Sequence, residues 1–385
     1  GITGTNGKTT TAFLVQHLLN QVSRAGLIGS IYYEDGLQRD PAEQTTPVPE
    51  VLHETLARMV ANGVTYCVME VSSHALDQDR TYGLSFSSAV FTNLTQDHLD
   101  YHHNFETYYQ AKRKLFHSTP FPEQCLMNQD DPYGRRLLDE LTGRSGLVSF
   151  GVHSACDYQA REIQLNRNGI RFCLTCRGKR FQVEAPLLLL HNVYNTLAAL
   201  GTVSEAGFPL ETLIPHLDHF PVVPGRLERI EEGQDFQVFV DYAHTPDGLL
   251  NVLSSLEGLS KNRVISVFGC GGDRDREKRP LMGEIANRFS DVVILTSDNP
   301  RSEKPGAILE EIKRGIEGCE KRAELVVTAD REEAICQAME TASAGDLVFI
   351  FGKGHEQHQI FGHERIPFSD QEAARRWLKT HVHAG

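Results

Sequence analysis

Short apolar segments alternate with amphipathic ones over much of the chain. Residues 64–71 and 87–94 are mostly apolar runs with the length of buried parallel strands. Residues 10–19, 49–62 and 104–116 carry apolar side chains at helical spacing. Strands that alternate with helices are typical of an α/β fold, so we expect a mostly parallel sheet covered by helices.

The chain divides into two predicted domains at a proline- and glycine-bearing stretch, residues 221–225. We place the boundary near residue 222, which gives domains of 1–222 and 223–385. Within the first domain, residues 120–182 alternate short strands with turns and predict a small antiparallel β addition. The second domain is again α/β, with five predicted strands at 236–241, 263–269, 291–296, 323–327 and 346–352.

The beginning of the chain predicts a phosphate-binding loop. Gly4 and Gly7 allow a tight turn whose backbone N–H groups point inward, and a predicted helix follows it. Lys8 and Thr9 stand where a P-loop places an ammonium on the phosphates and a hydroxyl on Mg²⁺. Ile2 occupies the position of the usual first glycine, so a glycine-rich turn with an incidental lysine is the alternative.

Carboxylate and imidazole groups follow the two predicted strands of the first domain. Glu70 lies near the carboxyl end of the strand at 64–71, where ligands bind in open α/β sheets. Residues 95–103, which follow the strand at 87–94, are rich in Asp and His. Beside a P-loop these groups favour Mg²⁺ and ATP chemistry, with zinc as the alternative for 95–103. For Glu70 the alternative is an ion-paired or helix-capping side chain.

Lys112 falls within the apolar stripe of the helix predicted at 104–116. One interpretation is a lysine that reaches the surface or an ion-pair partner with its ammonium. The other is an amine whose depressed pKa frees it for chemistry. The pattern alone leaves both open.

Composition and charge exclude several classes of protein. A chain that is 40% hydrophobic and 23% charged is typical of globular enzymes. The net charge of −13 argues against nucleic acid or an anionic membrane as a bulk partner, so an anionic substrate needs local basic residues. No apolar run reaches the ~18 residues of a membrane span. The eight cysteines are scattered, which indicates reduced thiols in a cytoplasmic protein.

Several motifs occur in order along the chain and resemble those of the Mur ligases, ATP-dependent enzymes that join an amino acid to a carboxylate. They are Gly4-Thr-Asn-Gly-Lys-Thr9, Glu70-Val-Ser-Ser-His74, the runs 92–102, 109–116 and 191–200, Pro224-Gly-Arg-Leu-Glu228, the runs 241–247 and 271–280, Asp298-Asn-Pro-Arg-Ser-Glu303 and Gly352-Lys-Gly-His-Glu356. The resemblance spans the chain and is closest to the tripeptide-forming branch of the family.

This resemblance implies a P-loop-type central ATPase domain, followed by a Rossmann-like C-terminal domain that binds the amino acid. It implies ligation of meso-diaminopimelate to UDP-N-acetylmuramoyl-L-alanyl-D-glutamate through an acyl phosphate, a step of peptidoglycan precursor synthesis. The implied partners are ATP, Mg²⁺ and these small molecules, and the enzyme is expected to act as a cytoplasmic monomer.

The resemblance also implies the residues of the nucleotide and metal sites. Lys8, Glu70, His98 and Lys112 are the implied catalytic residues, and the lysine that matches Lys112 is N-carbamylated in this family. Thr9, Glu70, His98 and carbamylated Lys112 are the implied magnesium ligands. The implied ATP-binding residues are Thr3, Gly4, Thr5, Asn6, Gly7, Lys8, Thr9, Asn192, Arg226 and Asp241. For Asn192 a helix cap is a compatible alternative.

Two further sets of residues are implied for the other substrates. The muramoyl dipeptide would be held by Gln44, Thr45, Thr46, Ser72, Gln78 and Arg80. The implied diaminopimelate site comprises Arg274, Asp298, Asn299, Pro300, Arg301, Gly352 and Glu356. Diaminopimelate differs from L-lysine chiefly by a distal carboxylate, and lysine-adding members lack the arginine that matches Arg301. The alternative is a surface arginine paired with Glu303.

Other activities stay open at this point. They are an L-lysine-adding Mur ligase, a folylpolyglutamate synthetase-like ligase, and a P-loop ATPase that ligates nothing. The motifs Asp298-Asn-Pro-Arg301 and Ser72-Ser-His74 argue against the folylpolyglutamate type. A chain that begins at Gly1, inside a motif and without Met, is expected to be a fragment that lacks an N-terminal UDP-binding domain.

Overall fold

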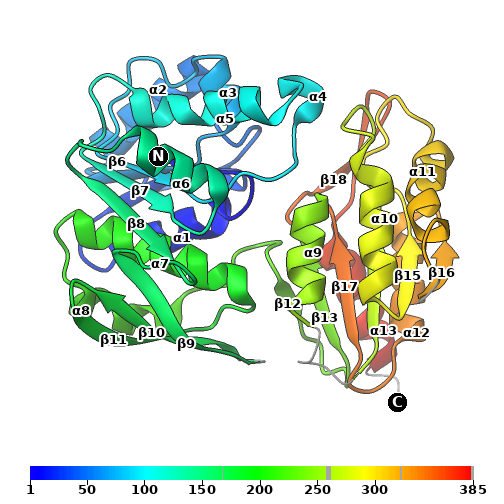
Figure 1. Ribbon diagram of the computed structural model, residues 1–385. Coiled ribbons are helices and arrows are strands. Elements are labelled where there is room, and N and C mark those ends of the chain that lie inside the picture. Colours follow the sequence, from blue (N-terminus) through cyan, green and yellow to red (C-terminus); the bar gives the residue numbers. More distant parts are fainter. Residues whose placement is uncertain (167, 257–261, 321–322, 383–385) are drawn as a thin grey trace. The chain divides into compact units, whose positions relative to one another are not determined.

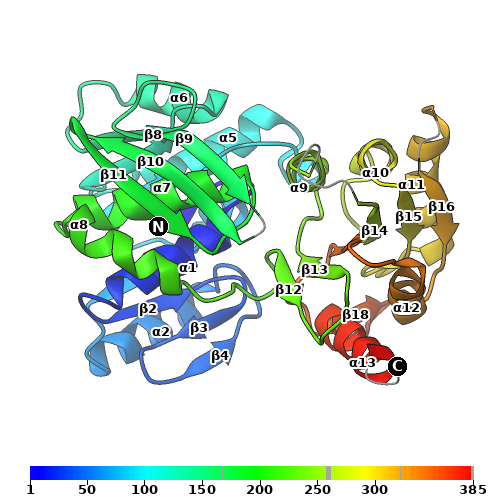
Figure 2. The ribbon, with the colours of Figure 1, turned by 90° about the horizontal axis from the view of Figure 1, so that it is seen from below.

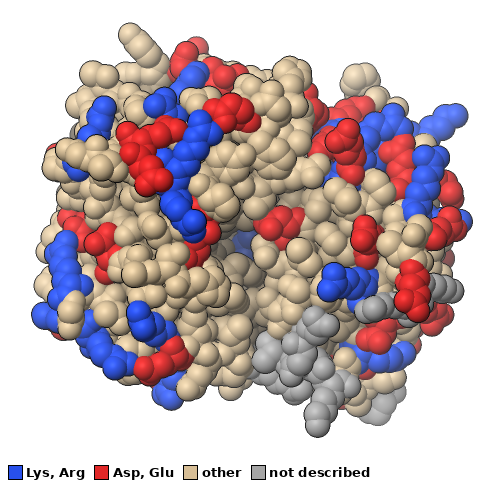
Figure 3. Space-filling model, viewed as in Figure 1, with Lys and Arg blue, Asp and Glu red and all other residues tan. Residues whose placement is uncertain are grey.

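The computed structural model describes residues 1–166, 168–256, 262–320 and 323–382. They form two compact units, Gly1–Thr95 with Tyr101–Pro221 and Gln96–Asp100 with Val222–Gly385. Figure 1 shows the helices and strands of both units. None of the described helices is both long and apolar enough to cross a membrane. On the face seen in Figure 3, basic and acidic side chains are interspersed.

The first unit is built on two sheets that meet at its first strand. Their strand orders are β1-β6-β7-β8-β9-β10-β11 and β4-β3-β2-β5. Ile2 forms an isolated parallel bridge with Glu70, the residue after β5, and this bridge joins the sheets. The strands are β1 (Ile2–Thr3), β2 (Ala25–Ile28), β3 (Tyr32–Glu34), β4 (Arg39–Pro41), β5 (Tyr66–Met69), β6 (Ser88–Phe91), β7 (Gln124–Asn128), β8 (Leu147–Gly151), β9 (Tyr158–Asn166), β10 (Gly169–Cys176) and β11 (Lys179–Ala185).

The centre of this unit is parallel. β1, β6, β7 and β8 pair in parallel with their neighbours, and β2 pairs in parallel with β5. Since parallel strands end at the same edge of a sheet, the loops that follow β1, β5 and β6 meet at one edge. The strands predicted at 64–71 and 87–94 are confirmed as β5 and β6.

The predicted antiparallel addition at 120–182 is wrong in its first half. β7 and β8 belong to the parallel sheet, and the helix α6 (Pro132–Glu140) makes the crossover between them. Only β9, β10 and β11 form an antiparallel extension. Short apolar runs do not reveal the direction of pairing, but Asp131 before Pro132 is a helix-start signal that the sequence contained.

Helices cover both faces of the large sheet of the first unit. Cys125 and Met127 of β7 share a core with Tyr109 of α5 and Leu137 of α6. Leu126, between them on the strand, contacts α7 on the other face. The helices of this part of the chain are α1 (Lys8–Leu19), α2 (Pro49–Ala61), α3 (Ser73–Asp77), α4 (Leu99–His102), α5 (Phe105–Arg113), η1 (Lys114–His117), α6, α7 (Leu190–Glu205), α8 (Leu210–Leu213) and η2 (Ile214–His219).

The second unit is a three-layer α/β structure. Its main sheet has the order β12-β13-β17-β14-β15-β16, in which only β12 is antiparallel to its neighbour. The five strands predicted for this part are confirmed as β13 to β17. The strands are β12 (Glu228–Ile230), β13 (Gln237–Asp241), β14 (Val264–Phe268), β15 (Val292–Leu295), β16 (Glu324–Val327), β17 (Leu347–Phe351) and a hairpin of β18 (His358–Phe361) and β19 (Glu364–Pro367).

Within the second unit, Figure 2 shows α9, α10 and α11 on one face of the sheet and α12 and α13 on the other. The apolar runs of β14, β15 and β17 are buried throughout, as expected of strands covered on both faces. The helices are α9 (Pro246–Ser254), α10 (Lys278–Phe289), α11 (Pro305–Glu317), α12 (Arg331–Thr341) and α13 (Asp370–Val382).

Candidate active site

The loop between β1 and α1 has the backbone of a phosphate-binding loop. Gly4 and Gly7 have φ of 151° and 87°, which side chains rarely tolerate. A Cβ at Gly4 would overlap the hydroxyl of Thr92, and one at Gly7 would overlap the side-chain oxygen of Asn195. Gly7 also caps the amino end of α1, where exposed N–H groups and the helix dipole favour an anion.

The loop after β6 holds the P-loop in place. Asn93 accepts the backbone N–H of Thr5 on its carbonyl and that of Asn6 on Oδ1, each at 2.9 Å. The Thr92 hydroxyl donates to the Asn6 carbonyl at 2.6 Å. The Thr5 hydroxyl lies 3.1 Å from that of Tyr108 on α5. Two predicted ATP-binding residues are therefore fixed by neighbours from β6 and α5.

Two lysines converge on the Gly4 carbonyl oxygen. Lys8 Nζ donates to it at 2.9 Å and to the Thr5 carbonyl at 2.9 Å, and Lys112 Nζ donates to it at 2.8 Å. Lys112 is only 1% exposed, and its ammonium lies 4.5 Å from the centroid of the Tyr108 ring. The interpretation of Lys112 as a surface-reaching side chain is therefore wrong. Its amine lies inside, at the P-loop.

Glu70 is a fully buried carboxylate held by neutral donors. Its Oε1 accepts the Ser30 N–H at 2.8 Å, and its Oε2 accepts the hydroxyls of Ser30 at 3.1 Å and Thr9 at 2.8 Å. Within the described residues Glu70 forms no ion pair and caps no helix, so both alternatives for it are wrong. A buried carboxylate that keeps its charge needs a cation, and Thr9 supplies a second oxygen beside it.

His98 is assigned to a different compact unit from Glu70 and Lys112. It belongs to the segment Gln96–Asp100, which groups with the second unit. Its φ is 54°, and its Nε2 lies 3.3 Å from Oδ2 of Asp97. The structure therefore brings Lys8, Thr9, Glu70 and Lys112 into one unit and leaves the place of His98 among them a prediction.

The nucleotide-contacting asparagine predicted on α7 has a neighbour that reaches the P-loop. Asn192 uses its own amide locally, because Nδ2 donates to the Leu188 carbonyl at 2.7 Å and Oδ1 accepts from Asn195 Nδ2 at 2.8 Å. Asn195 Oδ1 accepts the hydroxyl of Thr11 on α1 at 3.3 Å. α7 begins before Asn192, so the helix-cap alternative is wrong.

Arg80 gathers residues predicted for the muramoyl dipeptide. Its guanidinium donates to Gln44 Oε1, to the Thr46 carbonyl at 2.9 Å and to Gln78 Oε1 at 3.0 and 2.7 Å. Each acceptor is neutral, and Arg80 forms no ion pair with any carboxylate of the described residues. Its charge is thus available to an anionic ligand.

Hydroxyl groups connect this cluster to Glu70. The Thr45 hydroxyl lies 3.1 Å from that of Ser30, which also contacts the Glu70 carboxylate. Thr46 is fully buried, donates to the Glu70 carbonyl at 2.9 Å and accepts the Ser72 N–H at 3.0 Å. The predicted dipeptide residues therefore form one continuous polar network with Thr9 and Glu70.

In the second unit, Asp241 ends β13 and Arg226 precedes β12. Asp241 accepts the backbone N–H of Leu227 at 2.7 Å and that of Ala243 at 2.9 Å. Burial raises the pKa of Asp241, although Arg226 opposes the shift. The guanidinium of Arg226 lies 4.3 Å from the centroid of the Tyr242 ring. These two predicted ATP-binding residues are thus close neighbours.

Loops after β14 and β15 converge around Arg301 with the hairpin of β18 and β19. Arg301 has a φ of 51°; its N–H donates to the Ile360 carbonyl at 3.0 Å, and its carbonyl accepts from Gly362 at 2.7 Å. Its Nη1 donates to the Gly272 carbonyl at 2.7 Å. A Cβ at Gly271 would come within 2.9 Å of that Nη1, so glycine leaves the room the guanidinium needs.

Arg301 keeps its charge unpaired within the described residues. Glu303 instead pairs with Arg279, whose Nη1 and Nη2 lie 2.9 and 2.7 Å from its two oxygens, so the predicted alternative of an Arg301–Glu303 pair is wrong. Burial lowers the pKa of Arg301 and repulsion from Arg274 adds to the effect, whereas the carboxylates of Asp298, Glu356 and Asp273 oppose it. A half-buried cation beside a second cation is suited to an anionic ligand.

Asn299, Lys353 and Glu356 form one hydrogen-bonded group. Lys353, which is fully buried, donates to Asn299 Oδ1 at 3.1 Å and to Glu356 Oε2 at 2.8 Å, and Asn299 Nδ2 donates to the same Oε2 at 2.8 Å. A Cβ at Gly352 would lie 2.6 Å from Asp298 Oδ2. The structure thus brings the motifs at 298–301 and 352–356 together, with Pro300 buried between Asn299 and Arg301.

A buried ion pair braces the strands that carry these motifs. Arg331 and Asp370, both with fully buried side chains, are joined at 2.7 and 2.8 Å. Arg331 also donates to the carbonyls of Ser297 at 3.3 Å and Phe351 at 2.8 Å. It therefore ties the end of β15 to the end of β17, just before each motif.

Sequence reasoning missed Ser30, Asn195, Arg279 and Lys353. Ser30 and Lys353 each follow a glycine at the end of a strand, which is a usable signal. Asn195 and Arg279 lie within the motif runs 191–200 and 271–280, but their partners are 184 and 24 positions away, so local pattern does not predict these contacts.

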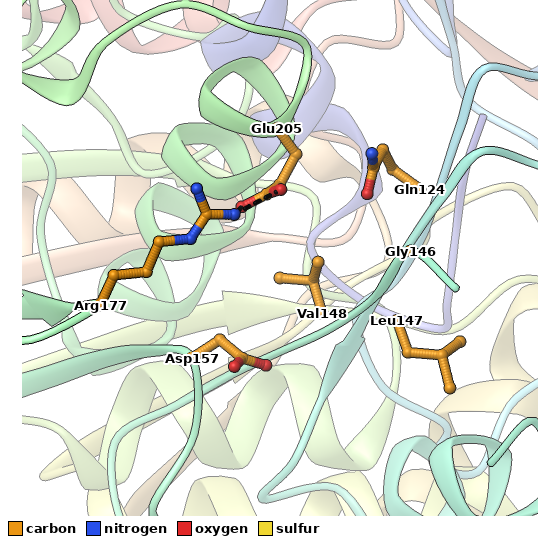
Figure 4. A pocket seen from close by; sticks show the side chains of 7 residues that line it. All are labelled: Gln124, Gly146, Leu147, Val148, Asp157, Arg177 and Glu205. Atoms are coloured by element: carbon orange, nitrogen blue, oxygen red, sulfur yellow. Dashed lines mark hydrogen bonds and ion pairs between the residues drawn. The ribbon is translucent and has the colours of Figure 1, made fainter. Parts of the chain in front are cut away.

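A pocket of about 330 Å³ in the first unit lies away from these groups. Gln124 begins β7 and Leu147 begins β8, so the pocket opens at the amino ends of the strands, opposite the P-loop edge. In Figure 4 Arg177 and Glu205 point toward each other across it and form an ion pair at 2.6 Å. None of its lining residues is a predicted site residue.

Two family domains match the chain. The Mur ligase middle domain matches residues 2–203, and the Mur ligase glutamate ligase domain matches residues 225–354. The chain belongs to the Mur ligase family. The resemblance seen in the motifs is thereby confirmed, and so is the α/β fold class.

Similarity to known relatives covers almost the whole length of this Mur ligase. UDP-N-acetylmuramoyl-L-alanyl-D-glutamate–2,6-diaminopimelate ligase from Thermosynechococcus vestitus is 46% identical over 382 residues, 98% of this chain and 76% of the relative. A solved structure of an enzyme with that name has 36% identity and a TM-score of 0.67, covering 99% of this chain and 78% of its own. MurF from Thermotoga maritima in complex with ADP, at 16% identity and a TM-score of 0.70, covers all of this chain and 80% of its own and shares the fold.

Proposed function

We propose that this Mur ligase uses ATP to join meso-diaminopimelate to UDP-N-acetylmuramoyl-L-alanyl-D-glutamate, the activity for which its relatives are named. The observation that carries the proposal is the unpaired guanidinium of Arg301, half-buried among motif loops of the second unit. It offers a bidentate partner to a distal carboxylate, which diaminopimelate has and L-lysine lacks.

The P-loop residues support binding of the ATP phosphates. The Gly4–Gly7 turn, the amino end of α1 and the ammonium of Lys8 converge there. Lys8 now donates to two carbonyls, and a phosphate can replace these neutral partners with a gain in charge interaction. We assign the remaining nucleotide contacts to Thr3, Thr5, Asn6, Thr9, Asn192, Arg226 and Asp241.

The buried Glu70 and the hydroxyl of Thr9 fit Mg²⁺. This ion usually binds one or two carboxylates together with phosphates and water, and no group of three His, Cys, Asp or Glu side chains in the described residues forms a cage of its own. We propose that Thr9, Glu70, His98 and a carbamylated Lys112 hold Mg²⁺, which would neutralise charge on the phosphates. Carbamylation would also turn the repulsion between Lys8 and Lys112 at the Gly4 carbonyl into attraction.

The chemistry is positioning and charge stabilisation. The glutamyl carboxylate of the dipeptide attacks the γ-phosphorus, ADP leaves, and the diaminopimelate amine then displaces phosphate from the acyl phosphate through a tetrahedral intermediate. Lys8 would stabilise negative charge on the phosphates. Arg80, with Gln44, Thr45, Thr46, Ser72 and Gln78, would orient the acidic dipeptide. Arg301 and Glu356 would take the distal carboxylate and ammonium of the amino acid, with Arg274, Asp298, Asn299, Pro300 and Gly352 shaping the site.

The deciding experiment compares kcat/KM for meso-diaminopimelate and L-lysine in the full-length enzyme. We expect a preference for diaminopimelate of at least about 10³-fold, because L-lysine would leave the half-buried guanidinium of Arg301 without a carboxylate partner. Arg301→Ala should remove most of that preference while the KM for ATP stays nearly constant. Equal or better use of L-lysine would identify a lysine-adding ligase, and ATP hydrolysis that needs no amino acid would identify an ATPase of another class.

We further propose that the enzyme acts as a monomer in the cytoplasm, where ATP and a uridine-diphosphate-linked precursor are available together. The eight cysteines are free thiols, which fits a reducing compartment. Size-exclusion chromatography coupled to light scattering would measure the mass of the particle, and a dimer would overturn the first part of this proposal.

A further inference from the structure

We infer that Arg279 acts as a positioning residue for amino-acid selection, because it withholds Glu303 from Arg301. This inference rests on the proposed function of Arg301 and names a residue outside the pocket on which that function depends. Arg279 would touch no substrate. It would keep one carboxylate of the Arg301 loop, that of Glu303, from taking the place of the ligand.

Glu303 is the obvious competitor for Arg301. It lies two residues along the same loop, and its side chain is 20% exposed. A carboxylate tethered this closely has a high effective concentration, so it would compete strongly with a free amino acid for the guanidinium. An Arg301–Glu303 pair would close the site to an anion.

Arg279 occupies both oxygens of this competitor. Its Nη1 lies 2.9 Å from Oε2 of Glu303 and its Nη2 lies 2.7 Å from Oε1, which is a bidentate geometry. The backbone N–H of Asp273 donates to the same Oε1 at 2.7 Å. The hydrogen bonds from Arg279 are the chief cause that lowers the pKa of Glu303 to about 2, so the carboxylate stays charged and paired with Arg279.

Arg279 itself has no freedom to turn toward other partners. Its side chain is fully buried on α10; Nη1 also pairs with Glu311 at 2.8 Å, and Nη2 donates to the Gly271 carbonyl at 3.2 Å. Burying a guanidinium is costly unless it is paired. Both Nη atoms of Arg279 are paired, and only its buried Nε has no hydrogen-bond partner among the described residues.

The loop is held so that Arg301 and Glu303 keep separate partners. The N–H and hydroxyl of Ser302, between them, donate to Asp273 at 3.2 and 2.6 Å. Arg301 is fixed by its backbone bonds to the β18–β19 hairpin and by its bond to Gly272. The loop thus carries Glu303, which forms an ion pair with Arg279, and Arg301, which donates to a neutral carbonyl.

The test is a double-mutant cycle in the full-length enzyme, read out as the ratio of kcat/KM for meso-diaminopimelate to that for L-lysine. Arg279→Met keeps the apolar volume and frees Glu303, so we expect the ratio to fall at least tenfold. Glu303→Gln alone should keep the ratio within threefold. The Arg279→Met/Glu303→Gln double variant should recover at least threefold of the loss, because the freed competitor is gone.

Arg276→Met is the matched control. Arg276 is largely exposed and pairs with Glu311, but it does not contact Glu303 in the described structure, so its loss should leave the ratio unchanged. If Arg279→Met does not fold, Arg279→Lys provides a second measurement, because a lysine cannot hold both oxygens and should lower the ratio by a smaller factor.

The outcomes separate this inference from the proposed function. Failure of the unaltered enzyme to prefer diaminopimelate would overturn the proposed function. In an enzyme that does prefer diaminopimelate, an unchanged ratio in a folded Arg279→Met or Arg279→Lys variant would refute the inference that Arg279 keeps Glu303 from pairing with Arg301. So would a double variant whose ratio is lower than that of Arg279→Met, because Glu303 would then be a support rather than a competitor.

Discussion

Glu70 in the first unit and Glu303 in the second are both carboxylates beside a candidate site, but their donors differ. Among the described residues, the side chain of Glu70 accepts from the neutral groups of Ser30 and Thr9 alone, whereas Glu303 accepts a bidentate pair of bonds from the cation Arg279. Neutral donors orient a carboxylate and leave its charge intact. A guanidinium orients it and cancels the charge.

The same distinction separates the arginines. Arg80 and Arg301 donate to neutral oxygens, while Arg279 and Arg331 are committed to carboxylates. The kind of partner, more than burial, therefore indicates which charged groups are available to substrates. Glu70, Arg80 and Arg301 are predicted site residues with neutral partners, whereas Glu356 is a predicted site residue that pairs with the cation Lys353.

The largest expected effect tests this contrast directly. Glu70→Gln keeps the shape of the side chain and removes the charge, so we expect kcat to fall by about 10³-fold, with a higher Mg²⁺ requirement. Glu303→Gln should lower kcat by far less, since its charge serves only the scaffold. Similar losses in both variants, measured across a range of Mg²⁺ concentrations, would remove the distinction.

A second variant sharpens the contrast within the first unit. Lys112→Ala should lower kcat about 10²-fold, because it removes the proposed carbamate and with it one negative charge at the P-loop. Short carboxylates such as acetate should restore part of the activity, and bicarbonate should raise the activity of the unaltered enzyme depleted of CO₂. Full activity of Lys112→Ala in CO₂-free buffer would contradict carbamylation.

Arg80 tests whether a cation with neutral partners serves a substrate. Arg80→Ala should raise the KM for the muramoyl dipeptide about 30-fold, the loss of a charge-assisted contact, and leave the KM for ATP nearly constant. Steady-state kinetics with each substrate varied in turn would show this. An effect confined to ATP would assign Arg80 to the nucleotide.

The smallest expected effect is on stability. The pKa of Glu303 is lowered to about 2 from an ordinary 4.5, so its contribution to the free energy of unfolding is complete above pH 4.5 and is lost as the pH falls toward 2. Glu303→Gln should therefore be less stable by about 1 kcal/mol at pH 7, with the difference shrinking in acid. Urea unfolding of both proteins between pH 7 and pH 3.5 would measure it. If the difference in unfolding free energy between the two proteins did not change with pH, the charge of Glu303 would not contribute to stability.

Local pattern predicted much of the fold but not its long-range partners. β5, β6 and β13 to β17 follow from apolar runs of strand length, and α5 follows from its stripe. The stripe put Lys112 on the apolar face but did not predict that its amine is buried. β7 and β8 were misassigned because an apolar run does not state which strand it pairs with, or in which direction. The contacts of Arg279 and Asn195 could not be predicted, because their partners are brought close only by the tertiary fold.

The contact of α7 with the P-loop has a consequence for how the protein is made. Thr11 and Asn195 are bonded across 184 residues, and α1 is buried along nearly its whole length. While the ribosome is still synthesising the segment before α7, α1 is an apolar helix without this cover, and the turn at Gly7 lacks its brace. We therefore expect competence to bind nucleotide only after α7 (Leu190–Glu205) has been synthesised and has docked. ATP in the cell can therefore stabilise only chains that have passed this point.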